Sequence, residues 1–399
     1  MYMPKSWTLA FWVGAALAAI GLMTLWSAGP SAAADLGGNC CADLEERIAE
    51  LESTTARKGN KKVSLTVAGQ VNAGLLYVDI EDYSNTTVIN NGNDENFVSF
   101  AGSARVNADI SAGYVLKLEA RDLGILGEPA GSFTPRVQQS YWFLKSEALG
   151  RVSVGKGAVA THGFDEITTA NTAVANKPLS LGALSDAYLT GIDVPFDGGY
   201  SNIVRYDSPA LSGFTASASW GPSFDATSSD GNGDTYDVAL RYAGDIQGFK
   251  MAGGLGYRKS TDFEVTILNT NTIYIPTGDV TTFLVSGSIM HTGTGLFITG
   301  NYADQDWDDA GFKLKGYAAT GGIERKWFSV GATTLYGEWN KFELKDGGGS
   351  GSIDMYGLGA VQALDAAAMD LYVSYRRYDL GDLGADDLTA VTAGARIKF

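Results

Sequence analysis

Few residues in this chain of 399 are of the types that perform catalysis or bind metals. His162 and His291 are its only imidazoles, and Cys40 and Cys41 are its only thiols. A Ser/His/Asp triad or a zinc site needs such groups together with suitable partners, and neither histidine has a catalytic partner in the sequence. We therefore expect no enzyme activity and no resident cofactor.

One acidic stretch has the spacing of a calcium-binding loop but lacks the residues that such a loop needs. Asp304, Asp306 and Asp308 alternate as carboxylate ligands would. However, Asp309 stands where the sharp turn requires glycine, and Lys315 stands where the bidentate glutamate should be. The sequence therefore does not predict a calcium site of this kind.

The overall composition excludes some classes of protein and favours another. The net charge of −16 and the pI near 4.5 argue against nucleic-acid binding, which needs a basic face. The 51 glycines, 8 tryptophans, 19 tyrosines and 17 phenylalanines point to many strands rather than helices. The membrane β-barrel is the class that keeps such a length as one all-β unit without a large dry core.

The first 34 residues have the layout of a secretory signal peptide. Lys5 is their only charge, an apolar run follows it, and the segment ends on small residues. We predict cleavage after Ala34, so that the mature chain begins at Asp35. A transmembrane helix is the alternative, but the small-residue end and the lack of a basic flank disfavour it. No later stretch approaches the roughly 20 apolar residues that a spanning helix needs.

Residues 35–61 are expected to form a periplasmic segment with one short helix. Its seam residues, at spacings of 3, 4, 3 and 4, are Cys41, Leu44, Ile48, Leu51 and Thr55. Barely two heptads are too few for a coiled coil that is stable by itself. The helix therefore either helps subunits to associate or is an amphipathic linker. Whether Cys40 and Cys41 pair with each other or with a neighbouring chain stays open.

From residue 62 onward the side chains alternate between apolar and polar with a period of two. Val67 and Val71 fall on one face of the first such stretch, and Gln70 and Asn72 fall on the other. One lipid-compatible face and one wet face are typical of a barrel strand that borders a water-filled interior.

The same test predicts an all-β, sixteen-stranded antiparallel transmembrane barrel over residues 62–399. The predicted strands are 62–79, 97–109, 112–122, 136–146, 150–157, 201–208, 214–221, 234–244, 248–261, 281–292, 295–305, 315–328, 331–343, 353–364, 368–379 and 388–399.

The predicted connections alternate between long and short along the whole chain. Their lengths, in order, are 17, 2, 13, 3, 43, 5, 12, 3, 19, 2, 9, 2, 9, 3 and 8 residues. Short turns on one rim, long polar loops on the other and an even number of strands are typical of an outer-membrane barrel. We therefore expect short periplasmic turns and long extracellular loops.

Two features predict contacts with other components of the outer membrane. Phe399 ends an alternating strand. Such a terminal aromatic residue is either only an anchoring side chain at the lipid boundary or, as in bacterial outer-membrane barrels, also part of the signal that the barrel assembly machinery reads. The acidic outer loops could loosely bind a divalent cation that bridges lipopolysaccharide phosphates, which stays open as an alternative to the absence of any cofactor.

Three stretches resemble the alphaproteobacterial general-diffusion porins, trimeric proteins of the outer membrane. They are Asp43-Leu-Glu-Glu-Arg-Ile-Ala-Glu-Leu-Glu, Lys61-Lys-Val-Ser-Leu-Thr-Val-Ala-Gly-Gln70-Val-Asn, and the ending Ala395-Arg-Ile-Lys-Phe399. The resemblance implies a homotrimer of barrels that passes small hydrophilic solutes by diffusion. It also implies that the third long loop folds into the lumen and narrows it. In this sequence that loop is 158–200, the outlier of 43 residues.

Opposed charges are expected across this lumen. Loop 158–200 contains one lysine, Lys177, and five carboxylates: Asp165, Glu166, Asp186, Asp193 and Asp197. An acidic loop opposite a basic wall creates a transverse field that orients dipolar solutes and filters ions by charge. The basic residues with the parity of the interior are Arg105, Lys117, Arg121, Arg151 and Arg205. The alternative is that each of them is a solvated residue of the lumen or of a loop, with no role in selectivity.

Three other functions compete with a general-diffusion channel. A substrate-selective channel would share the fold, a barrel enzyme would need a catalytic constellation, and an adhesin or envelope anchor would conduct nothing. Bilayer conductance and liposome swelling distinguish these functions.

Overall fold

The computed structural model describes residues 62–81, 83–91, 93–121, 134–176, 196–222, 233–267, 273–308, 311–346, 349–383 and 386–399. The predicted signal peptide, the cleavage site between Ala34 and Asp35, and the short helix lie outside these ranges and stay predictions. Residues from Thr66 to the C-terminus form one compact unit. Within the described ranges, no helix is long and apolar enough to cross a membrane.

This unit consists almost entirely of strands. The strands are β1 (Thr66–Ile80), β2 (Tyr83–Asn90), β3 (Asn96–Arg105), β4 (Ile110–Arg121), β5 (Thr134–Ser146), β6 (Gly150–Ala158), β7 (Tyr200–Asp207), β8 (Phe214–Pro222), β9 (Asp234–Ile246), β10 (Phe249–Ile267), β11 (Ile273–His291), β12 (Leu296–Trp307), β13 (Phe312–Phe328), β14 (Gly331–Asp346), β15 (Gly349–Leu364), β16 (Met369–Asp379) and β17 (Leu388–Lys398). Two single-turn 3-10 helices, η1 (Asp365–Ala367) and η2 (Gly381–Leu383), flank β16.

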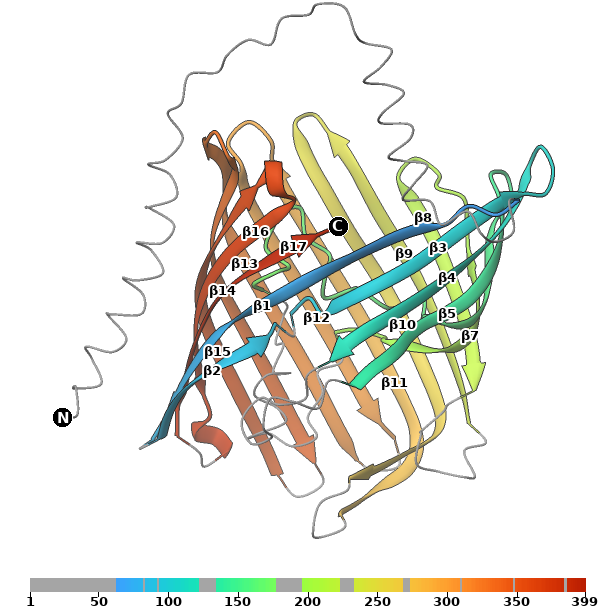
Figure 1. Cartoon of the computed structure of the whole chain (residues 1–399). Coiled ribbons are helices and arrows are strands. Elements are labelled where there is room, and N and C mark those ends of the chain that lie inside the picture. The colour runs from blue at the N-terminus through green and yellow to red at the C-terminus, as the bar shows by residue number, and fades with distance from the viewer. Residues whose placement is uncertain are drawn as a thin grey trace, which may run out of the picture. The chain divides into compact units, whose positions relative to one another are not determined.

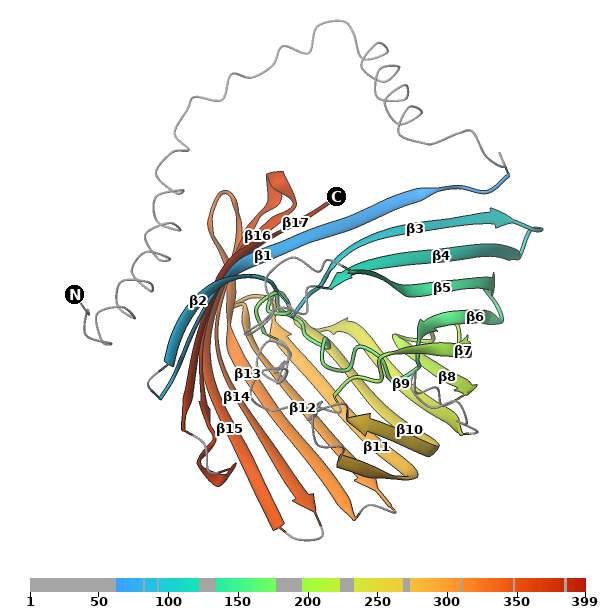
Figure 2. The ribbon, with the colours of Figure 1, turned by 60° about the horizontal axis from the view of Figure 1, so that its bottom comes forward.

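The strands close into one antiparallel barrel (Figures 1 and 2). Consecutive strands pair from β3 to β17, and the barrel closes where β1 pairs with β17 on one edge and with β3 on the other. At this junction the amide of Phe399 donates to the carbonyl of Gly69 at 3.0 Å, and the amide of Gly69 donates to the carbonyl of Phe399 at 2.9 Å. The predicted sixteen-stranded barrel is confirmed, with β2 as an added segment.

The prediction that residues 80–96 form an open loop is wrong. Residues 83–90 form β2, which pairs with residues 73–80 of β1. The turn between the two strands includes Glu81, whose φ of 49° is left-handed. The sequence of β2, Tyr-Ser-Asn-Thr-Thr-Val-Ile-Asn, lacks a regular apolar face, so its strand depends on backbone hydrogen bonds that side-chain periodicity does not reveal.

Two other predicted long connections are shorter than expected. β10 and β11 continue as a hairpin into the stretch 262–280, and β14 and β15 leave only residues 347 and 348 between them. In 262–280 the apolar residues Phe263, Val265 and Ile267 alternate, so the period of two continues into this stretch, whereas 344–352 is rich in glycine and serine and extends the ladder without an apolar face. The strict alternation of long and short connections therefore does not hold on this rim.

Candidate functional site

The barrel wall has an exposed apolar outer face and a polar inner face. On β9, Tyr236, Val238 and Leu240 are 48%, 53% and 43% exposed, whereas Asp237 is only 2% exposed. Successive side chains of a strand point to opposite faces, so Asp237 faces the interior. An apolar band outside and polar groups inside suit a barrel that stands in lipid and holds water.

Residues 159–176 of the longest connection follow this inner face. Near the start, the amide of Thr161 donates to Asp237 on β9 at 3.0 Å. Near the end, Asn176 Nδ2 donates to Thr320 Oγ1 on β13 at 2.8 Å. Between these points the segment bonds to the inward groups Ser219 on β8, Ser286 on β11, Asn301 on β12, Glu324 on β13, and Asp370 and Arg376 on β16.

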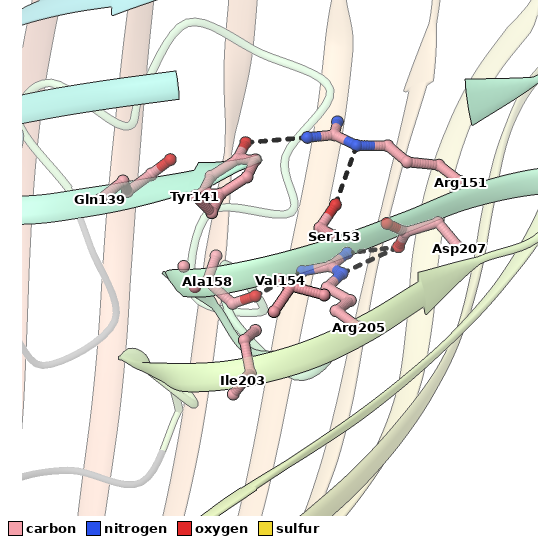
Figure 3. A pocket seen from close by; sticks show the side chains of 11 residues that line it. Gln139, Tyr141, Arg151, Ser153, Val154, Ala158, Ile203, Arg205 and Asp207 are labelled. Atoms are coloured by element: carbon pink, nitrogen blue, oxygen red, sulfur yellow. Dashed lines mark hydrogen bonds and ion pairs between the residues drawn. The ribbon is translucent and has the colours of Figure 1, made fainter. Parts of the chain in front are cut away.

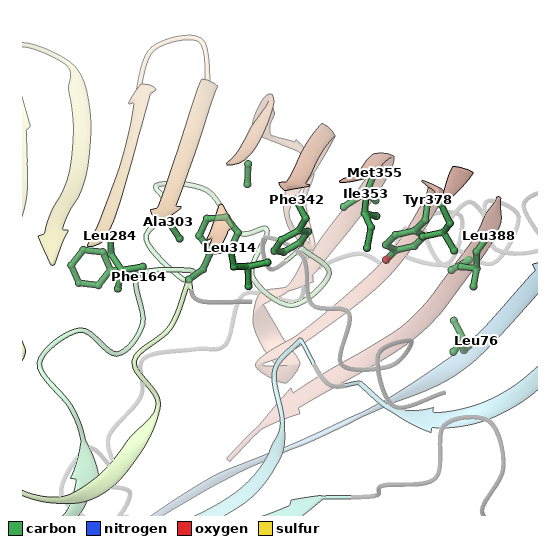
Figure 4. Packing of buried hydrophobic residues seen from close by; sticks show 14 of the residues in the cluster. Leu76, Phe164, Leu284, Ala303, Leu314, Phe342, Ile353, Met355, Tyr378 and Leu388 are labelled. Atoms are coloured by element: carbon green, nitrogen blue, oxygen red, sulfur yellow. The ribbon is translucent and has the colours of Figure 1, made fainter. Parts of the chain in front are cut away.

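Two phenylalanines anchor the ends of this connection against the wall, and Figure 4 shows the first of them, Phe164, beside Leu284. Phe164 is 0% exposed and lies over Gly254, where an added Cβ would come within 2.9 Å of its ring. Phe196 is 2% exposed and meets the ring of Phe342 edge-on at 6.3 Å between centroids. Glycine in a strand makes room for such close approach. Both ends of the connection are therefore packed inside the barrel.

Asp197 ties the two ends of the connection together. Its carboxylate lies 2.7 Å from Nδ1 of His162 and accepts a bond from the amide of Gly163 at 2.7 Å. Burial opposes ionisation of Asp197, but the hydrogen bond and charge of His162 and the amides of Gly163 and Gly199 outweigh it and lower the pKa to about 2. Asp197, which is half-buried, therefore holds the two ends of the connection together.

The other predicted loop acids have different positions. Glu166 is exposed and lines a hollow of about 810 Å³ between the loop and strands β5–β10. Asp165 is half-buried beside Phe164 in the same stretch. Asp186 and Asp193 lie outside the described residues, so their roles stay predictions.

Two predicted basic residues lie together on the inner wall formed by β6 and β7 (Figure 3). Arg151 donates to Ser153 Oγ at 3.0 Å and to the Tyr141 hydroxyl at 2.9 Å. Arg205 pairs with Asp207 at 2.7 Å and also donates to the carbonyl of residue 159 at 2.8 Å. Both line a hollow of about 150 Å³. Arg205 therefore holds the base of the loop, whereas the hydrogen-bond partners of Arg151 are uncharged hydroxyls.

The remaining predicted basic residues are not gathered at one point. Lys117 on β4 lies 3.9 Å above the ring centroid of Phe97. Arg105 is exposed at the end of β3, beside a short turn and away from this pair. Arg121 is the last residue of β4, and its side chain lies outside the described positions.

Sequence reasoning missed two arginines that hold the loop. Arg241 on β9 donates to the carbonyl of His162 at 2.6 Å, and its guanidinium lies 4.7 Å from the ring centroid of Phe164. Arg258 on β10 donates to the carbonyl of Gly198 at 2.6 Å. Parity could have found Arg241, because it alternates with the outward Leu240 and Tyr242.

The acidic stretch that mimics a calcium loop is instead part of a strand ladder. Asp304 pairs with Lys315 at 3.3 Å, and Asp306 pairs with Lys313, across β12 and β13. In the part of the chain that the structure describes, no group of three or more His, Cys, Asp or Glu residues could hold a metal ion.

Comparison with known proteins identifies the family. Residues 15–395 match the family described as Gram-negative porin. The chain belongs to this family. The closed barrel and the family membership make it a porin that forms a channel in the outer membrane, and they point to a channel rather than an enzyme. No curated protein matches its sequence.

Solved structures with a similar fold are distant in sequence. The anion-selective porin from Comamonas acidovorans has a TM-score of 0.59 and 17% identity, covering 84% of this chain and 100% of its own. OmpT of Vibrio cholerae without loop L8 has a TM-score of 0.60 and 17% identity, and the match covers 85% of this chain and 100% of OmpT. The trimer form of OmpT has a TM-score of 0.57 and 16% identity, and the match covers 85% of this chain and 100% of OmpT. At this identity the likeness concerns the fold alone.

Proposed function

We propose that the porin is a general-diffusion channel of the alphaproteobacterial type, in which connection 158–200 narrows the pore and filters solutes by charge. The observation that carries this proposal is the course of residues 159–176, which bond to inward groups from β8 to β16. A loop that occupies the lumen leaves less cross-section for solutes, and diameter and field then determine what passes.

The charges beside the opening support filtering. Glu166 and three arginines, Arg151, Arg205 and Arg241, line the same hollow of about 810 Å³. Carboxylate and guanidinium groups on opposite sides of a water-filled passage set up a field across the path of a solute. The solutes would be small hydrophilic molecules and ions that fit the passage.

We infer that three such barrels assemble into a homotrimer. The support is the likeness in fold to a porin whose structure is described as a trimer form, OmpT of Vibrio cholerae. The predicted helical seam within residues 35–61 would add a small contribution. Contacts with lipopolysaccharide and the barrel assembly machinery belong to the same proposal, since the protein resides in the outer membrane.

Liposome swelling with sugars and amino acids of graded size tests the proposal. A general-diffusion channel should show rates that fall smoothly with solute mass. A strong preference for one solute at equal mass would favour a selective channel, and a protein that neither swells liposomes nor conducts in bilayers would favour an envelope anchor.

The role of the loop is tested by removing about the central third of connection 158–200. The shortened protein should fold and show larger conductance, because the anchors Phe164 and Phe196 near the ends remain. Unchanged conductance in a correctly folded variant would exclude this connection as the narrowest part.

A further inference from the structure

The strand that follows β1 leaves the barrel wall part-way along its length. β2 pairs with β1 as far as Asn90 opposite Ala73, and β3 resumes with Phe97 opposite Gln70. Figure 2 shows β2 and β3 lying beside the same strand β1. Two residues of β1 therefore face six residues, 91–96, of the neighbouring strand. The extra residues cannot remain in the ladder and must leave the sheet.

Inward-facing side chains hold this excursion inside the barrel. From β1, Gln70 Nε2 donates to the carbonyl of Glu95 at 2.9 Å, and Asn72 Nδ2 donates to the carbonyl of Asp94 at 2.8 Å. From β17, Arg396, which is 5% exposed, pairs with the carboxylate of Asp94.

Glu95 itself is held from the opposite side of the excursion. Its carboxylate accepts a bond from Gln138 Nε2 on β5 at 2.9 Å. Glu95 and Asp94 are both partly exposed. The described part of the excursion, residues 91 and 93–95, therefore presents two carboxylates toward the lumen.

The excursion also meets the far end of the long loop. Asn91 Nδ2 donates to the carbonyl of Val174 at 2.8 Å, and both residues are buried. The loop thus covers the inner wall from β8 to β16, and the excursion continues the same inner rim at β17 and β1. Glu95 then reaches across to β5, where Gln138 Nε2 also donates to the buried Glu119 of β4 at 3.2 Å and Arg136 pairs with Glu119 at 3.1 Å.

Wall groups of β4 and β7 interact with both acidic segments. Lys117 has favourable electrostatic interactions with Glu95 of the excursion and with Glu166 of the loop. Tyr200, at the start of β7, is also within the electrostatic reach of both carboxylates. Glu95 of the excursion and Glu166 of the loop therefore both lie within electrostatic reach of the inner wall at β4 and β7.

We propose that residues 91 and 93–95 form a second selectivity element of the pore, in which Glu95 adds negative charge to the lumen beside β5. The inference requires the protein to be a channel, but it does not depend on connection 158–200 being the narrowest part. A solute ion that passes a charge at a distance of several ångströms in water experiences about the thermal energy. One fewer carboxylate should therefore lower the cation-to-anion permeability ratio about twofold at low salt.

Reversal potentials of the wild-type protein and of Glu95→Gln in a KCl gradient test the proposal. Glutamine keeps a side-chain oxygen that can accept the bond from Gln138, so the charge changes with little change in shape. Glu95→Asp retains the charge and should restore most of the wild-type ratio. Glu343→Gln is the matched control, because Glu343 lies next to the inward Phe342 on β14 and so faces outward.

Salt dependence distinguishes a charge effect from a structural one. The difference between wild type and Glu95→Gln should fade at about 1 M salt, where the Debye length is about 3 Å, whereas a displaced segment would alter conductance at every salt concentration. If the wild-type channel conducts and Glu95→Gln leaves its permeability ratio unchanged, this inference is overturned and the proposed function is unaffected. If the wild-type protein does not conduct at all, the channel itself is in question. A shift of equal size in Glu343→Gln would also overturn the inference.

Discussion

Replacing Phe164 by alanine should release the loop from the wall while leaving the barrel folded. The ring is fully buried, packs over Gly254 and Gly256, and lies under the guanidinium of Arg241. Deleting a buried phenyl group costs about 3–5 kcal/mol, to which a desolvated cation–π contact contributes up to about 2 kcal/mol. The side chain takes no part in the strand ladders, so the cost falls on the docking of the loop. A loss of about 3 kcal/mol lowers the ratio of docked to undocked loop roughly 150-fold.

Single-channel recording in planar bilayers measures this change. We expect a larger mean conductance and more open-channel noise, because the loop would leave its docked position more often. Leu255→Ala is the control, since Leu255 lies on the outer face of β10 and is 51% exposed. The shift in electrophoretic mobility on heating verifies that each variant is a folded barrel.

A second variant approaches the same contact from the wall. Gly254→Val would place side-chain atoms within the space of the Phe164 ring, where even a Cβ would come within 2.9 Å. It should reproduce the conductance change of Phe164→Ala. Wild-type conductance and noise in both folded variants would refute the reasoning that this contact holds the loop.

Three further predictions concern pH, barrel closure and assembly. The pKa of Asp197, about 2, lies below its ordinary value of 3.8, so its ionised form stabilises the loop above pH 3.8 and this stabilisation is lost as the pH falls through 2. Conductance recorded against pH should therefore show no loosening of the loop from this group between neutral pH and about pH 4. Gly69→Val should lower the yield of folded barrel in refolding assays, because a Cβ there would lie 2.5 Å from the ring of Phe399 and 2.6 Å from a backbone oxygen. Polar replacement of the predicted seam residues Leu44, Ile48 and Leu51 should weaken the trimer only modestly on native electrophoresis, since two heptads contribute little. A single-subunit mass for the intact wild-type protein would contradict the trimer.

The parity of the strands could be predicted because it is a local property. Val67 and Val71 face outward and Gln70 is buried on the inner side, as their alternation indicates, since successive Cβ atoms point to opposite faces of a strand. The same rule gave Arg151 and Arg205 their interior positions. It could not say how far Arg105 lies from them, because parity fixes only the face of a residue: Arg105 shares a cross-strand row with Arg151, but β4 and β5 lie between their strands.

A barrel with a lipid-facing outside and a polar inside could be predicted from local sequence, because the period of two and the strand lengths depend on neighbouring residues. The segments that enter the lumen could not be predicted in this way. The excursion and the docking of the loop depend on contacts between distant parts of the chain, such as the bond from the Tyr372 hydroxyl to Asn72 at 2.9 Å and that from Asn91 to Val174. Such contacts join residues that are far apart in the sequence, so no local pattern predicts them.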